Sequence, residues 1–498
     1  MSANLLASLI GIPFIWGLVL VFFPKEKIQG IRVLSAIISF ILLILSGYLF
    51  LNYDYTLGGF QFVQDTPWLN SIGISLSFGV DGISVPMILL TGIVTFTGVL
   101  ISWSVEERVK EFFVLFFLLV AGVFGVFVAL DLFFFFFFYE LAVMPMYLLI
   151  GVWGSSSDFG SFLRPKEYGA MKLMIVLVAG SVLVWIALLA VYVESSSGTF
   201  SLLTIGETTF SRNFQIVFFP MFMVGFGILA GLWPFHTWSP DGHVAAPTSV
   251  SMLHAGVLMK LGAYGIIRVG IDILPEGAQE WMWLLMVLGT INVVYGAISA
   301  MGQRDLKYVI GYSSVSHMGY VLMGIATLNA IGMGGAVLQM FSHGIMTALF
   351  FALVGAIYQR SHVRDIGILE GIGKRMGVTS AFFAVAGLAS LGLPGLSGFI
   401  AELMVFIGVF SSYPPIFGIL AIIGAGITAV YILRLLAKVF FGPLDTRWTN
   451  LTDLNRTEFV SSSILVAFLL IVGLYPKPWM DMIDSGLIPI LEGVKNLT

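Results

Sequence analysis

Several ionisable side chains lie inside long apolar stretches of this sequence, where a charged group is energetically costly. Placing a charge at the centre of a bilayer costs roughly 2.5–3.5 kcal/mol on insertion scales, so such residues usually line an ion pathway. Carboxyl, amine and imidazole groups can all take up and release a proton in a suitable environment. We therefore predict a proton relay with these members: Glu140, Lys260, Glu402, His317 and His343.

The two acids of this set have different sequence contexts. Glu140 follows a run of phenylalanines at 133–138 and precedes apolar residues, so nothing near it in sequence can pair with it. It must face the protein interior, either as a proton carrier or in a static ion pair between helices. Glu402 comes shortly after the stretch 392–398, which is rich in helix breakers. Backbone groups freed there can line a hydrated cavity beside the acid.

The lysines and remaining histidines are weighed against simpler roles. A buried lysine can exchange a proton, which an arginine cannot, so we expect Lys260 to belong to the relay, with snorkelling of its amine to a surface as the alternative. Lys172 lies near the start of its apolar stretch, which favours snorkelling. His236 and His254 are candidates for relay or pairing, or simply satisfied polar groups. No histidine pair has zinc-site spacing, so we predict no metal site.

The elements that carry these residues are transmembrane helices. The chain of 498 residues is 58% hydrophobic and 10% charged, with a mean hydropathy of +1.01. These values indicate an all-α integral membrane protein of about 14 spans. The first span has no preceding basic stretch or cleavage site, so we expect it to be retained. We expect spans near 4–23, 31–52, 84–103, 112–130, 132–152, 171–193, 215–235, 249–270, 280–300, 308–326, 333–357, 377–408, 415–440 and 458–476.

Two of these spans contain helix breakers at matching places. Pro234 interrupts span 7, and Pro394 with Gly395 interrupts span 12. Both are fourth in a set of five, spans 4–8 and 9–13, which predicts two five-helix repeats with discontinuous helices, the second repeat inverted. We accordingly divide the chain into helices 1–3 (1–110), a first repeat (111–275), a second repeat (276–440) and a C-terminal loop, helix and tail (441–498).

The basic residues predict an orientation. Most of the 23 Lys and Arg residues fall in alternate loops, which the positive-inside rule places in the cytoplasm. Both termini are then expected on the non-cytoplasmic side, in a bacterial inner membrane or alternatively a thylakoid-type membrane.

Several kinds of chemistry are not expected from this chain. It has no cysteine, so it holds no disulfide and no thiolate-bound iron–sulfur cluster. It has no phosphate-binding loop or dinucleotide fingerprint, and its net charge of −4 does not suit nucleic acid. Any redox cofactor must be bound by partner subunits.

Four motifs together resemble the antiporter-like proton-pumping subunits of respiratory complex I, most closely the subunit M or chain 4 type. They are YELAVMPMY (139–147), WPFHTWSPDGHVAAPT (233–248), DLKYVIGYSSVSHMG (305–319) and GLPGLSGF (392–399). The resemblance implies a proton-translocating subunit of an NADH- or ferredoxin-quinone oxidoreductase, beside antiporter-like L- and N-type subunits. Partner subunits would carry iron–sulfur clusters and quinone, with FMN as a further candidate. It also assigns key roles to Glu140, Lys260 and Glu402, places His317 and His343 on the central axis, and sets His236 beside the break.

One departure from the family pattern stands out. The family usually has a lysine before the Pro-Phe-His of span 7 as the partner of the span 5 glutamate, but Leu229 stands there. We hypothesise that Lys172 or Lys260 pairs with Glu140 instead. The alternatives are a subunit of a multisubunit sodium/proton antiporter or of a membrane-bound hydrogenase, or a structural subunit with impaired pumping.

Overall fold

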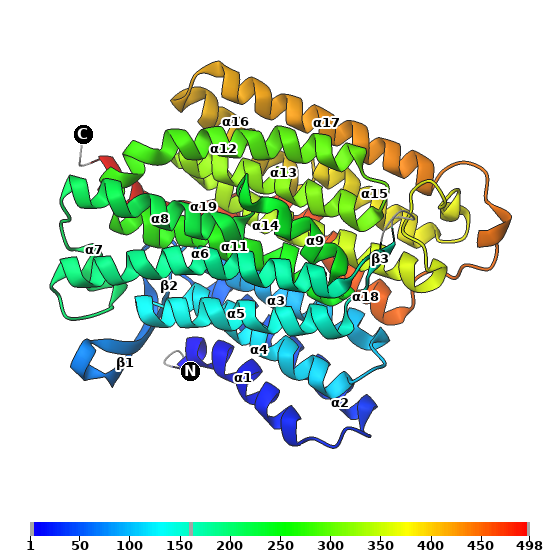
Figure 1. The fold of residues 1–498 in the computed structure, drawn as a ribbon, viewed down its shortest axis with the longest axis horizontal. Coiled ribbons are helices and arrows are strands. Elements are labelled where there is room, and N and C mark those ends of the chain that lie inside the picture. The colour runs from blue at the N-terminus through cyan, green and yellow to red at the C-terminus, as the bar shows by residue number, and fades with distance from the viewer. Residues whose placement is uncertain (1–3, 159–162, 496–498) are drawn as a thin grey trace.

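The computed structural model describes residues 4–158 and 163–495 as an elongated bundle of helices running side by side (Figure 1). Thirteen segments of this described chain are long and apolar enough to cross a membrane. A further crossing is made by two shorter apolar helices in series, Gly377–Ser390 and Ser397–Ser412. The prediction of about 14 spans with a discontinuous span 12 is confirmed.

The N-terminal helices are α1 (Leu5–Phe22), α2 (Ile28–Asn52) and α3 (Ser84–Ile101), followed by the short helix η3 (Ser102–Ser104). Between α2 and α3, in a region outside the predicted spans, the chain forms an antiparallel hairpin of β1 (Gln61–Leu69) and β2 (Ile74–Val80), joined through η2 (Asn70–Ile72). Gly73 closes this turn with φ +67°, and a Cβ there would collide with Gly198, so only glycine fits.

The first repeat comprises the next five spans. Its elements are α4 (Val109–Val128), α5 (Leu132–Trp153), β3 (Ser157–Asp158), β4 (Leu163–Arg164), α6 (Lys166–Ser195), α7 (Leu202–Gly206), α8 (Arg212–Ala230), η4 (Phe235–Thr237), α9 (Trp238–Ala245), α10 (Thr248–Leu253), η5 (His254–Leu258), α11 (Met259–Gly265) and η6 (Ile266–Ile271). Span 7 is broken between α8 and α9, as predicted: Gly231 ends α8 with φ +80°, and Pro234 lies in the gap.

The second repeat has the same number of spans. Its elements are α12 (Pro275–Gly302), α13 (Leu306–Ala326), α14 (Ala330–Ser361), η7 (Ile372–Lys374), α15 (Gly377–Ser390), α16 (Ser397–Ser412) and α17 (Pro415–Val439). Gly392 and Gly395, at φ +72° and +93°, turn the chain between α15 and α16. The predicted break at Pro394 and Gly395 is therefore present, and α16 starts a few residues before Glu402.

The C-terminal region corrects one expectation. After η8 (Thr446–Trp448) and α18 (Arg456–Leu474), the predicted tail is instead the helix α19 (Lys477–Lys495), which packs against α14. Its apolar residues lie on one side and its charged residues on the other, a pattern that hydropathy windows for spanning helices overlook. The limits of the four predicted regions stay a prediction.

Side-chain caps begin two of the helices that carry the predicted relay. The Asp131 carboxylate accepts hydrogen bonds from the backbone N–H groups of Phe133 and Phe134 at the start of α5. Asp305 does the same for Lys307 and Tyr308 at the start of α13. Each cap satisfies N–H groups that have no partner within the helix, so the cap residue sets where the helix starts.

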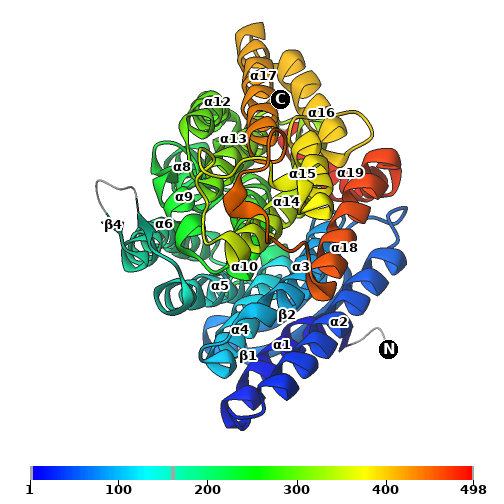
Figure 2. The same ribbon diagram turned by 90° about the vertical axis from the view of Figure 1, so that its right-hand side faces the viewer.

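The packing places two spans at the centre of the bundle. The most apolar 18-residue stretches of the eighth span (α10 to η6) and of α14 are completely buried, and α10 and α14 lie in the interior of the end-on view (Figure 2). The basic loops 23–28, 104–109, 303–306 and 362–377 lie at one end of the molecule, here called the basic end, while α1 begins and α19 ends toward the other (Figure 1).

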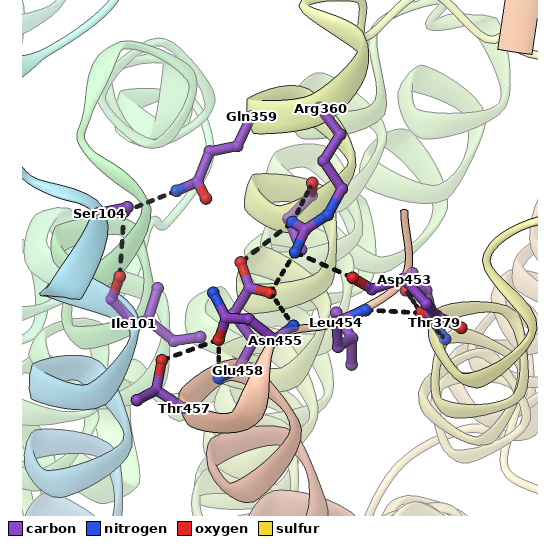
Figure 3. Close-up of polar contacts among 11 residues, drawn as sticks. Ile101, Ser104, Gln359, Arg360, Thr379, Asp453, Leu454, Asn455, Thr457 and Glu458 are labelled. Atoms are coloured by element: carbon purple, nitrogen blue, oxygen red, sulfur yellow. Dashed lines mark hydrogen bonds and ion pairs between the residues drawn. The ribbon is translucent and has the colours of Figure 1, made fainter. Parts of the chain in front are cut away.

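A polar lock holds the helices together at the basic end (Figure 3). Arg360 at the end of α14 forms an ion pair with Glu458 of α18 at 2.6 Å and also donates to the Asp453 carbonyl. The Asp453 carboxylate accepts bonds from the Thr379 hydroxyl and from the N–H groups of Val378 and Thr379 at the start of α15. The lock therefore fixes α14, α15 and α18 relative to one another.

Candidate functional site

Four of the predicted relay residues form one row through the interior, here called the central row. It runs from Lys260 of α11 through His343 of α14 and His317 of α13 to Glu402 of α16. The Lys260 Nζ lies 2.8 Å from the His343 Nδ1, and the two imidazole rings are 5.4 Å apart between centroids. The His317 Nδ1 lies 3.1 Å from the Glu402 Oε1. An amine and a carboxylate thus stand at the two ends of a pair of imidazoles.

Two neutral side chains that sequence analysis did not single out complete the acid end of the row. The Gln339 side-chain amide donates to the Glu402 carboxylate at 3.3 Å, and the Ser390 hydroxyl lies 2.9 Å from the His317 Nε2. Gln339 stands one helical turn before His343 on α14, a spacing that could have pointed to it. Ser390 ends α15 at the break, where only the fold brings it to His317.

The local backbone positions the amine of Lys260. The π-helical turn η5 comes just before it, and its amine donates to the carbonyl oxygen of Ala255 inside that turn. Single π-turns in helices leave backbone groups available for such contacts and often mark functional sites. Lys260 has no exposed surface, so the alternative in which its amine snorkels to a surface is wrong.

Two further histidines extend the polar interior toward the basic end. The rings of His243 and His254 lie 3.9 Å apart between centroids, and Trp238 stacks on His254. None of the four nitrogens of these two rings has a hydrogen-bond partner among the described residues. Beyond them, the Lys307 amine donates to the carbonyl of Ala246 at 2.7 Å. Buried nitrogens with spare hydrogen-bonding capacity are what a proton path requires.

An ion-pair cluster around Asp241 lies on the basic-end side of the first repeat. The Lys172 Nζ is 2.7 Å from the Asp241 Oδ2, the Arg164 guanidinium bonds the other carboxylate oxygen, and the Tyr308 hydroxyl donates to that same oxygen at 3.0 Å. Lys172 therefore neither snorkels nor pairs with Glu140. Sequence analysis missed Asp241, although its place between His236 and His243 in the broken span could have identified it.

Glu140 stands apart from these networks. Its side chain is partly exposed, its Oε1 has no hydrogen-bond partner, and it forms no ion pair among the described residues. Lys172 is engaged by Asp241 and Lys260 by His343, so the hypothesis that either amine pairs with Glu140 is wrong. Leu229 is fully buried where α8 meets α11. The acid of the first repeat thus lacks the lysine that the family pattern places at position 229.

His236 is also separate from the central row. It is buried beside the break in span 7 with its ring against Tyr295, and neither of its ring nitrogens has a hydrogen-bond partner among the described residues. Its position beside the break agrees with the sequence expectation, but no contact connects it to the relay residues that the structure brings together.

Comparison with known proteins gives consistent matches over nearly the whole chain. The profile described as NADH:quinone oxidoreductase/Mrp antiporter, TM, matches residues 129–428. The NAD(P)H-quinone oxidoreductase chain 4 of Gloeobacter violaceus is 35% identical over 96% of this chain and 90% of its own length. A chain of respiratory complex I from Thermus thermophilus with bound NADH is 26% identical, with a TM-score of 0.89 over 100% of this chain and 99% of that one. A chain of the Mrp complex from Dietzia sp. shares the fold at 19% identity, with a TM-score of 0.86, covering 100% of this chain and 98% of that one.

Proposed function

Since the chain belongs to the NADH:quinone oxidoreductase/Mrp antiporter transmembrane family, we propose that it is the proton-translocating, chain 4-type subunit of an NAD(P)H-quinone oxidoreductase. The observation that carries the proposal is the central row. Lys260, His343, His317 and Glu402 place proton donors and acceptors in one row from the last span of the first repeat into the second repeat, with 5.4 Å between the centroids of the two imidazoles. A row of ionisable groups enclosed by apolar helices is typical of a proton path and not of a binding site for a soluble substrate.

The row suggests how charge movement couples to the rest of the enzyme. Lys260 and Glu402 carry opposite charges when ionised, and the two imidazoles between them can relay a proton in either direction. Moving one proton from the amine to the carboxylate neutralises both ends, which changes the electrostatic field felt by neighbouring helices. Electron transfer in partner subunits would drive this redistribution through the contacts between subunits.

The surroundings of the subunit follow from the same proposal. It would lie in the membrane arm beside antiporter-like L- and N-type subunits, while partner subunits hold the iron–sulfur clusters, the quinone and, in one form, FMN. The basic end would face the cytoplasm and both termini the other side of a bacterial inner membrane or a thylakoid-type membrane. The higher identity to the oxidoreductase chain than to the Mrp chain favours this enzyme over a sodium/proton antiporter.

The test is proton translocation per electron in native membrane vesicles that contain Lys260→Met. We expect a loss of translocation of at least about tenfold, since a positioned proton-transfer group typically contributes about a hundredfold or more, with electron transfer retained when vesicles are uncoupled. Lys260→Arg is the matched control, since arginine keeps the positive charge and cannot release a proton. Assembly is verified by native electrophoresis.

Three outcomes separate the alternatives. Loss of translocation in both variants supports proton exchange at Lys260. Normal translocation in Lys260→Met would show that the subunit is structural. Transport that requires sodium, without dependence on quinone reduction, would identify an antiporter.

A further inference from the structure

A cavity outside the relay opens at the basic end between α12, α17 and the loop after α14. Its volume is about 280 Å³. Three cationic side chains line it: Arg304 from the loop after α12, and Arg434 and Lys438 from the last turns of α17. Arg434 and Lys438 are four residues apart, so they project from the same side of that helix.

The positively charged side chains that line this cavity outnumber the negatively charged ones. Asp365 is its one lining carboxylate, and it accepts a hydrogen bond from the N–H of Gly367. Within residues 4–158 and 163–495, Arg304, Arg434 and Lys438 take part in no ion pair and no side-chain hydrogen bond. Other arginines of the same end do find acids, for instance Arg360 with Glu458. The cavity therefore has a net positive charge and open hydrogen-bond donors.

The walls below the cavity are apolar and face outward. α17 lies along the outer edge of the molecule next to α12 (Figure 1). Ile298 and Met301 of α12 and Val430 and Leu433 of α17 are all exposed, which suits contact with lipid chains. Tyr431 lines the cavity, and its side chain is held in place because its hydroxyl donates to the Ser313 hydroxyl at 2.7 Å.

Two general effects explain part of this clustering of cations. The positive-inside rule gathers Lys and Arg at this end, and a cation such as Lys438 in the last turn of a helix is favoured by the helix dipole. Neither effect makes three cations from two separate elements converge on a single cavity that has one carboxylate. That convergence, above an exposed apolar surface, matches an amphiphile with an anionic head.

We propose that this cavity binds the headgroup of an anionic phospholipid, with its acyl chains lying on α12 and α17. The phosphate accepts hydrogen bonds from the two guanidinium groups, and the Lys438 amine supplies a further positive charge. The headgroup would lie in the cavity between the basic-end parts of α12 and α17. This binding is independent of proton translocation.

The test is native mass spectrometry of the purified full-length chain in detergent, titrated with phosphatidylglycerol or with zwitterionic phosphatidylcholine. The test variant is Arg434→Gln with Lys438→Gln. The matched control is Lys374→Gln with Arg375→Gln, two exposed cations of the same end that do not line the cavity. Circular dichroism verifies that each variant is folded.

We expect the test variant to bind phosphatidylglycerol about tenfold more weakly or worse, with phosphatidylcholine binding unchanged and the control like the parent chain. An equal weakening in test and control variants would overturn the proposal, because it would show only a diffuse attraction to the basic end. Unchanged affinity in the test variant would overturn it as well. Displacement of the lipid by millimolar inorganic phosphate would assign the cavity to a free anion.

Discussion

The two repeats differ most in the surroundings of the carboxyl group that each carries within a membrane span. In the second repeat, Glu402 is buried against His317 and Gln339, and the row continues to Lys260. In the first repeat, Glu140 is partly exposed beside apolar helices and has no cationic partner among the described residues. The carboxylate in the continuous span 5 thus lies outside the network of contacts that the carboxylate in the broken span 12 joins.

This difference indicates which part of the chain can transfer protons. An acid held by an imidazole and an amide has its carboxylate positioned and can exchange a proton with a defined neighbour. Glu140 has no amine or imidazole partner among the described residues, so proton transfer to or from it requires a group from elsewhere. We infer that most proton transfer takes place along the central row and that Glu140 is an auxiliary proton site.

The largest effect is expected from Glu402→Gln. The change keeps the shape and one hydrogen-bond acceptor but removes the proton-carrying carboxylate from the end of the row. We expect proton translocation per electron to fall at least about tenfold in vesicles, with uncoupled electron transfer retained. Translocation at the parent level would place the pathway outside the central row.

A smaller effect is expected from Leu229→Lys, which restores the amine that the family pattern has in span 7. Tyr139, next to Glu140, packs against Phe226, which lies one turn before Leu229 on α8. If the new amine meets Glu140, the variant is stable, whereas the same lysine combined with Glu140→Gln is less stable by about 3–5 kcal/mol, since its charge is buried without a partner.

The measurement is thermal unfolding of Leu229→Lys with and without Glu140→Gln, each compared with its parent. The coupling between the two changes is read as a double-mutant cycle. Equal destabilisation in both backgrounds would mean that position 229 does not face Glu140, and the contrast between the repeats would then need another origin.

Glu140→Gln should have a weaker effect on translocation than Glu402→Gln. No ion pair within the described chain is lost, so we expect a decrease of about twofold to fivefold, below the usual range for a proton-transfer group. Glu194→Gln, at an exposed position near the end of α6, controls for the loss of a carboxylate as such. A loss as large as that of Glu402→Gln would show that both repeats contain essential acids.

The smallest effect is expected at Asp453, an acid outside the membrane that is fully supplied with donors. Burial raises the pKa of this carboxyl, but the hydrogen bonds from Thr379 and from backbone N–H groups outweigh it, so its pKa lies below the ordinary value. Its contribution to stability is therefore complete above the ordinary pKa, about 3.9, and is lost as the pH falls through the lowered value.

Asp453→Asn should accordingly lower stability at pH 7 by about 1 kcal/mol, with the difference from the parent shrinking toward pH 3. Thermal unfolding of the purified chain at several pH values measures this. A difference that does not change with pH would mean that the carboxylate charge is irrelevant to the lock around Arg360 (Figure 3).

The sequence by itself determined the membrane character, the number of spans and the two broken helices. These depend on local properties: runs of apolar residues long enough to cross a bilayer, and proline and glycine at particular positions within them. It also identified the acid, the lysine and the two histidines of the central row, because an ionisable group in such a run is rare and costly.

Only the tertiary structure decided which of these residues meet. Lys260 and His343 are 83 residues apart in the chain, and the partner of Lys172 turned out to be Asp241 and not Glu140. Neutral residues such as Gln339 carry no charge signal in the sequence, yet packing places them on the acid. Partners across helices are fixed by how the bundle packs, and local residue patterns do not contain that information.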